Sequence, residues 1–235
     1  GACKNRRCLY PDICKKLKPD HSSQVRLLKR LRQVAGIKKI VVASGIRHDL
    51  VLADKMHGET YLKHVIRHHV SGQMKLAPEH TESEVLKLMG KPGPDDLIRF
   101  RELFTRISRE AGKKQFLTYY FIASHPGCDE SHMWSLKSFV NRNLKIQPEQ
   151  VQIFTPTPST FSSLMYHTGF DPFTGKPVFI EKDRTKKQRQ KDILTKKSRC
   201  VSRQKPVKRK PQILCRQQSK RRDSNSPPVT NRKRK

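Results

Sequence analysis

The stretch QMKLAPEHTESEVLKLMGKPG, residues 73–93, gives the clearest indication of the fold class. It opens with a short apolar run that is typical of a strand and that ends just before Glu79 and His80. Thr81 and Glu84 then form the T-x-x-E pattern of a capping box, which predicts the start of a helix. The stretch is therefore predicted to pass directly from a strand into a helix, with an acid and an imidazole at the junction.

The same alternation of strand and helix extends in both directions along the chain. Helices are predicted from runs with apolar residues at helical spacing, and strands from short β-branched or aromatic runs. The predicted order is helix 22–36, strand 37–44, helix 58–69, strand 73–77, helix 83–89, helix 95–111, strand 114–124, helix 130–143 and an extended segment at 151–158. Strands that alternate with helices indicate an α/β fold, either a parallel sheet or part of a (β/α) barrel.

Polar side chains follow three successive predicted strands. In α/β folds, functional groups gather where strands end and helices begin, so these side chains are expected to share one rim. The candidates are Ser44, Gly45, Arg47 and His48 after the first strand, Glu79 and His80 after the second, and Ser124, His125 and Cys128 after the third. Any one of them alone is better explained as a helix cap or a satisfied polar contact, so the inference rests on the repetition after three strands.

Positive charge is concentrated near the C-terminus. The 235 residues carry a formal net charge of +31. Residues 1–180 hold 29 basic and 16 acidic side chains, whereas residues 181–235 hold 22 basic and 4 acidic ones. The second segment also has few apolar residues, which predicts a disordered tail because little core formation offsets its chain entropy. Such a tail either binds nucleic acid or another polyanion non-specifically, or keeps the protein in solution.

Two groups of side chains have residue types that bind metals. Cys3, Cys8 and Cys14 form C-x4-C-x5-C, and thiolates are ligands of zinc and of iron–sulfur clusters. This spacing matches none of the common metal motifs, so reduced structural cysteines are the default interpretation. His64 and His68 are four residues apart on a predicted helix, a spacing that holds metals in some proteins. A solvated helix face is the alternative for this pair.

The sequence also bears on the compartment in which the protein works. No run of 18 apolar residues occurs, so we expect no membrane span, and residues 1–10 lack the apolar core of a signal peptide. Six cysteines in 235 residues do not resemble a secreted disulfide scaffold. We therefore expect a cytoplasmic, reducing setting. Because the chain does not begin with Met, we also expect it to be part of a longer protein.

Several long phrases, taken together and in order, resemble one family. They are CLYPDICKKLKPDH at 8–21, GIKKIVVASGIRHDL at 36–50, HHVSGQMKLAPEHTESEVLKLMGKPG at 68–93, FRELFTRISREAGKKQFLTYYFIASHPGC at 100–128 and PEQVQIFTPTPSTFSSLMYHTGFDPFTG at 148–175. These phrases closely resemble the C-terminal half of the YgiQ family of radical S-adenosylmethionine (SAM) proteins. The resemblance covers roughly residues 3–180, and the basic tail looks like the variable extension of that family.

The resemblance implies a partial, TIM-like (β/α) barrel and radical chemistry. In that superfamily a C-x3-C-x2-C loop holds three irons of a 4Fe-4S cluster, and SAM binds the fourth iron and is cleaved reductively. This chain contains no C-x3-C-x2-C, and the spacing of its early cysteines is different. We therefore expect a fragment of a radical SAM enzyme that depends on the cluster and SAM in its full-length form. Its substrate is not indicated, and the fragment alone is expected to be inactive.

By the same resemblance, the strand ends would form part of the mouth of the barrel. Ser44 and Arg47 are expected to contact SAM, with Arg47 as a bidentate donor to the SAM carboxylate. Glu79 and His80 would orient SAM or the substrate, or transfer a proton. His125, at the third strand end, is a further candidate for binding the cofactor. The expected organisation is a Cys-rich entry segment at 1–20, the barrel part at 21–180 and the basic tail at 181–235.

Two other functions stay open from the sequence. A nucleic-acid or polyanion-binding protein would use the basic tail, although no aromatic residue follows Phe179 to form a stacking platform. A zinc-stabilised domain would use Cys3, Cys8, Cys14 and one distant ligand. A nucleic-acid-binding module should carry basic and aromatic residues together on an ordered face, and metal analysis of the purified chain would separate the zinc-stabilised domain from the other two.

Overall fold

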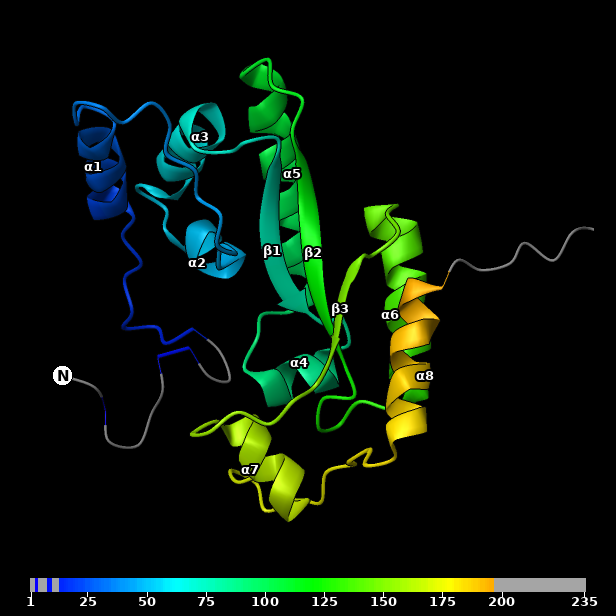
Figure 1. Cartoon of the computed structure of the whole chain (residues 1–235). Coiled ribbons are helices and arrows are strands. Elements are labelled where there is room, and N and C mark those ends of the chain that lie inside the picture. Colours follow the sequence, from blue (N-terminus) through cyan, green and yellow to red (C-terminus); the bar gives the residue numbers. More distant parts are fainter. Residues whose placement is uncertain (1–2, 4–7, 10–12, 197–235) are drawn as a thin grey trace, which may run out of the picture. The chain divides into compact units, whose positions relative to one another are not determined.

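Three parallel strands form the centre of the protein. The computed structural model describes residues 3, 8–9 and 13–196, all within one compact unit. Strands β1 (Gln73–Glu79), β2 (Phe116–Ala123) and β3 (Gln150–Ile153) are hydrogen-bonded in the order β1-β2-β3 (Figure 1). Leu76 pairs with Tyr119, and Phe121 pairs with Val151. The predicted α/β class with a parallel sheet is confirmed, as are the strands predicted around these positions.

Helices connect and flank the strands. α4 (Ser83–Met89) and α5 (Pro94–Glu110) link β1 to β2, while α6 (Glu130–Phe139) and the π-helical turn η1 (Val140–Leu144) link β2 to β3. The remaining helices are α1 (Ser22–Leu31), α2 (His48–Ala53), α3 (Gly58–His68), α7 (Phe161–Thr168) and α8 (Arg184–Thr195). Of these, α2, α7 and α8 were not predicted. Within the described ranges, no helix combines the length and the apolar character needed to cross a membrane.

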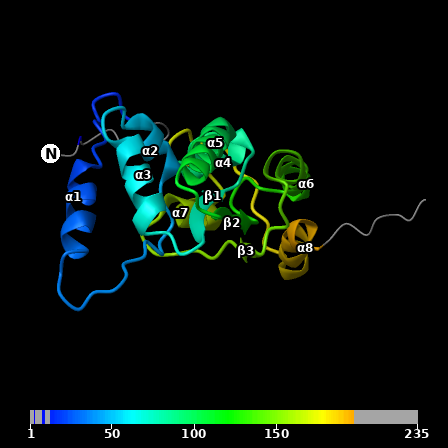
Figure 2. The same ribbon diagram turned by 90° about the horizontal axis from the view of Figure 1, so that it is seen from above.

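One face of the sheet carries the core. Alternate strand residues point to this face, and Leu76, Tyr119 and Phe121 are almost fully buried there. Phe100 and Phe104 of α5 belong to the same core, and the end-on view shows α5 along one side of the strands (Figure 2). Burial of a side chain of this size contributes about 1.5–3 kcal/mol. The alternation therefore fixes the register, because a shift by one residue would expose the whole set.

The opposite face of the sheet is only partly covered by the described residues. Phe116 is 59 % exposed, Lys75 is also exposed, and Thr118, Tyr120 and Ile122 are half-buried. In Figure 1, α5 lies behind β1 and β2, so this face points towards the viewer. Parallel sheets usually bury both faces. This face is therefore a surface on which further protein or a ligand would fit.

The strand predicted at residues 37–44 does not form. Within the described residues, the segment 37–44 is in no strand and no bridge, and the nearest parallel bridge joins Ile46 to Leu76. The Val42 backbone N–H instead donates to the His69 carbonyl. Ile37 and Val41 are exposed. β-branched residues favour a strand only where a neighbouring strand offers a continuous ladder of partners. Because that ladder is absent here, the prediction was wrong.

The capping box predicted at the start of α4 does not form either. α4 begins at Ser83 with Glu82 as its N-cap, and no side chain caps it. Thr81 lies one position before the N-cap and is buried. Its hydroxyl has no hydrogen-bond partner among the described residues. The T-x-x-E pattern alone was misleading because the imidazole of His80 bonds to the Glu82 N–H and fixes the turn instead.

The basic segment predicted to be disordered begins with the ordered helix α8. Its N-cap Asp183 accepts a hydrogen bond from the Lys186 backbone N–H at 2.8 Å. Gln190, Ile193 and Leu194 lie on one buried side of α8, which packs beside α6 (Figure 1). The prediction of disorder was wrong for this helix. Residues 197–235, the rest of the predicted tail, lie outside the described residues.

Candidate functional site

Two residues at the carboxyl edge of the sheet have a left-handed backbone. Glu79, the last residue of β1, has φ 66°, and Ser124, directly after β2, has φ 58°. For residues other than glycine this conformation costs about 1–2 kcal/mol. Strained positions of this kind cluster at functional sites. Here they turn the chain at the ends of two neighbouring strands, and the next residues, His80 and His125, are buried.

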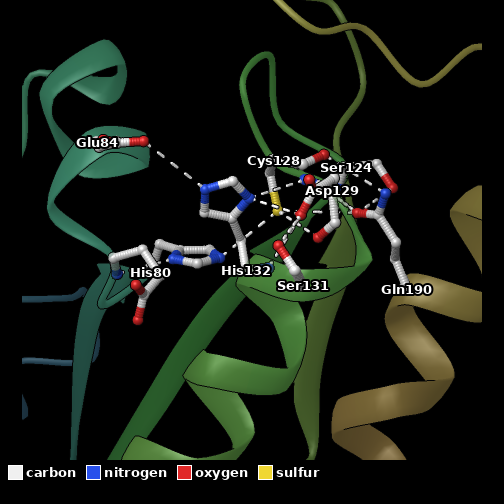
Figure 3. A network of polar contacts seen from close by, with 9 residues as sticks. His80, Glu84, Ser124, Cys128, Asp129, Ser131, His132 and Gln190 are labelled. Carbon is white, nitrogen blue, oxygen red and sulfur yellow. Dashed lines mark hydrogen bonds and ion pairs between the residues drawn. The ribbon is translucent and has the colours of Figure 1, made fainter.

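His80 is held in one tautomer. The Glu82 backbone N–H donates to its Nδ1 at 3.0 Å, so the ring proton of the neutral imidazole is on Nε2. Nε2 lies 3.5 Å from Sγ of Cys128 (Figure 3). Burial, followed by the charges of His132 and His125, lowers the pKa of His80 to about 3. At neutral pH, His80 is therefore a donor to the sulfur and cannot remove the proton of the thiol.

Cys128 has the properties of a structural thiol. Burial is the main reason that its pKa is raised to about 12, and its side chain is fully buried. A nucleophilic cysteine needs a lowered pKa and an adjacent base. Because His80 is a neutral donor, neither condition is met. We conclude that the His80–Cys128 contact ties the ends of β1 and β2 together and is not a catalytic pair.

Gln190 joins α8 to the same network. Its Oε1 accepts hydrogen bonds from the backbone N–H and the hydroxyl of Ser124, at 2.9 and 3.0 Å (Figure 3). Its Nε2 donates to the carbonyl of Cys128 at 3.4 Å. Gln190 is fully buried, so these bonds satisfy groups that water does not reach. The sequence prediction missed this residue because it falls in the segment that was assigned to the disordered tail.

Asp129 forms the rim of the network. Its carboxylate accepts hydrogen bonds from the Ser131 hydroxyl at 2.7 Å and from the His132 backbone N–H at 3.0 Å, which caps α6 (Figure 3). Partial burial works against ionisation, but these hydrogen bonds outweigh it and lower the pKa of Asp129 to about 2. His132 Nε2 also lies 4.0 Å from the carboxylate of Glu84 on α4. Asp129 is therefore ionised at neutral pH directly after the neutral thiol of Cys128 in the chain.

His125 connects the end of β2 to α7. Its Nδ1–H donates to the Pro126 carbonyl, and its Nε2 accepts from the Ser162 hydroxyl, both at 2.8 Å. Its ring packs edge-to-face on Phe154, with the ring centroids 5.1 Å apart. Burial lowers the pKa of His125 to about 4. Both ring nitrogens are engaged in hydrogen bonds, so this imidazole links the end of β2 to α7.

The other three predicted site residues lie closer to solvent. Ser44 is exposed, and Ile46, two residues later, pairs with β1. The guanidinium of Arg47 is held by both carboxylate oxygens of Asp49, at 2.9–3.0 Å. The carboxylate of Glu79 lies 2.9 Å from the Lys91 ammonium. The fold thus brings these residues to the region of the β1 edge, and their contact with a cofactor stays a prediction.

The early cysteines are placed without a metal-binding arrangement. Cys3 and Cys8 are exposed, and Cys14 is half-buried. The Cys14 backbone N–H donates to the Cys8 carbonyl at 2.8 Å. Among the described residues, no three His, Cys, Asp or Glu side chains are grouped so that they hold a metal ion. Metal binding by these cysteines stays a prediction.

We expect the stability of the folded chain to fall as the pH is lowered from about 7 to 5. Burial lowers the pKa values of His48, His80 and His125 from 6.5 to about 4, 3 and 4. The unfolded chain therefore binds protons on these rings in a pH range where the folded chain does not. Linkage then makes each such ring cost about 2 kcal/mol of unfolding free energy between pH 7 and 5.

Urea unfolding of the wild type and of His80→Gln at both pH values measures this effect. The variant should lose about 2 kcal/mol less than the wild type over the same interval, because one buried ring is gone. His167→Gln is the matched control, since His167 is exposed on α7. An identical pH dependence for His80→Gln and the wild type would show that His80 is not a buried neutral imidazole.

The chain resembles curated proteins over most of its length. It is 57 % identical over 197 residues to UPF0313 protein FN0734 of Fusobacterium nucleatum. It is 45 % identical to a UPF0313 protein of Clostridium perfringens and 41 % identical to one of Methanosarcina acetivorans, each over 194 residues. The chain is a partial-length match to the UPF0313 family. No protein-family model matches the chain.

The UPF0313 relatives are much longer than this chain. The matched residues make up 84 %, 83 % and 83 % of the chain, but 35 %, 29 % and 26 % of the three relatives. The chain thus spans about a third of the length of the curated relatives that it matches. The activity of a full-length UPF0313 protein therefore comes to this chain only as a proposal.

Proposed function

We propose that this chain is part of a radical SAM enzyme of the YgiQ type, for which it supplies some of the strands and helices of a partial (β/α) barrel. Three findings support the proposal. The long phrases that resemble the family run from residue 8 to residue 175. The match to UPF0313 proteins is similarly long and covers only part of them. The parallel β1-β2-β3 sheet with helical crossovers is the arrangement from which such barrels are built.

The observation that carries the proposal is the open side of the sheet together with its carboxyl edge. The face that the described helices leave partly open carries Lys75, Thr118 and Tyr120. Glu79 is the last residue of β1 and lies at the carboxyl edge of this sheet. In a (β/α) barrel this face lines the interior, and the carboxyl ends of the strands form the active-site mouth. A parallel sheet with one half-exposed face fits a barrel wall better than it fits an independent two-layer domain.

The chain does not provide ligands for the 4Fe-4S cluster. The C-x3-C-x2-C pattern is absent from the sequence, and Cys3, Cys8 and Cys14 have a different spacing. Cys128, at the carboxyl edge, is a buried neutral thiol, whereas a cluster ligand is a thiolate. The cluster would have to be bound by other residues of a longer protein.

The residues at the β1 edge fit SAM in part. Arg47 has a guanidinium fixed by Asp49, whose carboxylate is buried, and its remaining N–H groups suit the carboxylate of an amino acid. Glu79 and Ser44 add an acceptor and a hydroxyl. When bound, SAM and the cluster supply one-electron chemistry. The role of this chain is to bind and orient, while His80 and His125 hold the strand ends in place.

The decisive experiment uses the full-length product of the gene, purified without oxygen and loaded with iron and sulfide. With SAM and dithionite it should release 5′-deoxyadenosine, which chromatography quantifies. Arg47→Ala should raise the KM for SAM about tenfold or more, because charge-assisted hydrogen bonds contribute about 1.5–3 kcal/mol. Arg99→Ala is the matched control, since Arg99 pairs with Asp96 on the exposed side of α5.

Two outcomes would contradict the proposal in different ways. If the cluster-loaded protein releases no 5′-deoxyadenosine, radical SAM activity is excluded for it. If it does, but Arg47→Ala and Arg99→Ala behave alike, the enzyme class stands and the assigned SAM contact is wrong. Binding of nucleic acid or another polyanion by the basic segment stays a separate prediction, because most of that segment lies outside the described residues.

A further inference from the structure

Trp134, the one tryptophan of the chain, lies on the exposed side of α6. It is 54 % exposed, and among the described side chains of α6, η1 and α8 it is the one large apolar residue left exposed. Burial of an aromatic ring of this size is strongly favourable, so its exposure gives up stability. The packing of the core therefore does not explain why a tryptophan lies at this position.

The residues that flank Trp134 on the helix surface are short and polar. Ser131 and Ser138, at i−3 and i+4, are exposed, as is Asn141 at i+7. Residues at these spacings share one side of a helix. They leave the ring accessible, and they do not extend it into the broad apolar patch that is typical of a protein–protein interface. The surface therefore suits a partner that stacks on one flat ring and meets polar groups around it.

Two cationic side chains lie on the same helical segment as the ring. The Lys137 ammonium lies over Trp134, 5.3 Å from the ring centroid. Nε of Arg142 donates to the Ser138 carbonyl at 3.4 Å, and Ser138 is one helical turn from Trp134. Among the described residues, Lys137 and Arg142 both donate to backbone carbonyls and form no ion pair with a carboxylate. Their charges are therefore available to an anion that approaches the ring.

α8 extends this basic surface. The Lys137 ammonium donates to the Lys196 carbonyl at 3.2 Å, and Nε of Arg189 lies 3.2 Å from the Glu130 carboxylate. Both views show α6 and α8 side by side (Figures 1 and 2). Residues 184–196 hold six basic side chains and one acidic side chain. The two helices therefore present one surface with a large excess of positive charge.

The acidic side chains on this surface are already paired. Glu130 pairs with Arg189, and the Asp192 carboxylate lies 2.7 Å from the Lys196 ammonium. Such exposed pairs contribute little and leave the net charge of the surface positive. In the sequence, the basic character continues through residues 197–235, which hold 15 basic residues and one acidic residue. A polyanion is therefore the partner that the charge of this surface favours.

We propose that the exposed side of α6 and α8 binds single-stranded nucleic acid, with a base stacked on Trp134 and phosphates bound by Lys137 and Arg142. Proteins that bind single strands combine a basic surface, which follows the phosphates, with aromatic side chains on which the bases stack. In a duplex the base faces are covered by their neighbours, so a single strand is the form that offers a free face. An acidic peptide or a lipid headgroup supplies negative charge without a flat ring to match Trp134.

The fold supplies the aromatic side chain that the basic segment lacks in the sequence. No aromatic residue follows Phe179, so this segment alone has no stacking platform. α6 brings Trp134 next to α8 from a much earlier part of the chain. Basic and aromatic residues thus lie together on an ordered face, as a nucleic-acid-binding module requires. The proposal does not depend on the proposed enzymatic function, because it uses none of the residues at the strand ends.

Intrinsic fluorescence tests the proposal, because all tryptophan emission of the chain comes from Trp134. The chain of residues 1–235 is titrated with a single-stranded oligouridylate of about 12 nucleotides, a length within the range that such sites cover. A base stacked on the indole should quench the emission until the site is saturated. Inorganic polyphosphate of similar length carries the charge without bases, and it should bind without this quenching.

Substitutions separate stacking from charge, with binding followed by the anisotropy of a labelled oligouridylate. Trp134→Leu should weaken binding about tenfold, which is the contribution of one stacked base. Arg142→Gln should lower the slope of log affinity against log salt by about one, because one phosphate contact is lost. Arg109→Gln is the matched control, since it removes the same charge from an exposed position on α5 and should leave the slope unchanged. Residues 197–235 are present in every variant, so their contribution cancels.

The proposal is overturned if the oligouridylate binds without quenching, if polyphosphate quenches equally, or if Trp134→Leu binds as tightly as the wild type. Equal salt slopes for Arg142→Gln and Arg109→Gln would also overturn it. Trp134 and Arg142 are exposed, so both variants should fold, and circular dichroism verifies this. The assay needs neither cluster nor SAM, so its failure is distinguishable from a failure of the proposed enzymatic function.

Discussion

Replacement of Gln190 by Leu should destabilise the chain by about 3–5 kcal/mol, because each buried polar group left without a partner costs about 1–3 kcal/mol. Gln190 is the acceptor for two groups of Ser124 and a donor to the Cys128 carbonyl. Leu has a similar volume, so the packing of α8 is largely kept while the hydrogen bonds of the Gln190 amide to Ser124 and Cys128 are lost. The backbone N–H of Ser124, already in a strained conformation, would be left buried and unpaired.

Urea unfolding, followed by circular dichroism, measures the loss. Gln188→Leu is the matched control on the same helix, because Gln188 is exposed and bonds only to Asp192 among the described side chains. An exposed change of this kind alters stability by no more than about 0.5 kcal/mol. Equal effects of the two substitutions would show that α8 is not docked on the strand ends, and the network around Ser124 would then be wrong.

The parts of the fold that were predicted correctly depend on local pattern. β1 and β2 alternate between buried and exposed residues, and α5 repeats apolar residues at helical spacing, so both signals are present in short windows. The segment at 37–44 has the same β-branched composition but lacks a ladder of partners in the described residues. A strand depends on its neighbours, and composition alone does not reveal whether a neighbour is present.

In α8 the strongly basic composition obscured the weaker pattern of a helix with one apolar face. The run of basic residues predicted disorder, whereas Gln190, Ile193 and Leu194 recur at i, i+3 and i+4, which is the spacing of one helix face. Asp183 before the run is also a good N-cap residue, and its carboxylate accepts the Lys186 N–H. These signals were available in the sequence, and the charge of the exposed face outweighed them in the prediction.

The sequence predicted where the candidate site lies better than it predicted what its residues do. Glu79, His80 and His125 were expected at strand ends, and they are found there. Both imidazoles point inward because the backbone is left-handed at Glu79 and at Ser124. A left-handed backbone is not predicted from sequence where the residue is not glycine. Their tautomers depend on the Glu82 N–H and the Ser162 hydroxyl, contacts that only the folded chain defines.

Gly58→Ala should destabilise the chain by about 3 kcal/mol, the upper end of the range that is typical when a well-packed site is overfilled. A Cβ at Gly58 would collide with the carbonyl oxygen of Val51 and press on the Cβ of Asp54. The first obstacle is backbone, so no side-chain rotation relieves it. Ala is favoured over Gly inside a helix by about 1 kcal/mol, and the collision must exceed that gain.

The turn has little freedom to open around the new methyl group. The carboxylate of Asp54 accepts bonds from the backbone N–H groups of His21 and His57, both at 2.8 Å, and the Gly58 N–H donates to the Asp54 carbonyl. Gly93→Ala is the control, because nothing lies within 4 Å of a Cβ there and its φ of −65° suits Ala. Thermal unfolding of both variants measures the difference in stability between them. A Gly58→Ala chain as stable as Gly93→Ala would mean that α2 and α3 are not packed as closely as the backbone contact at Val51 requires.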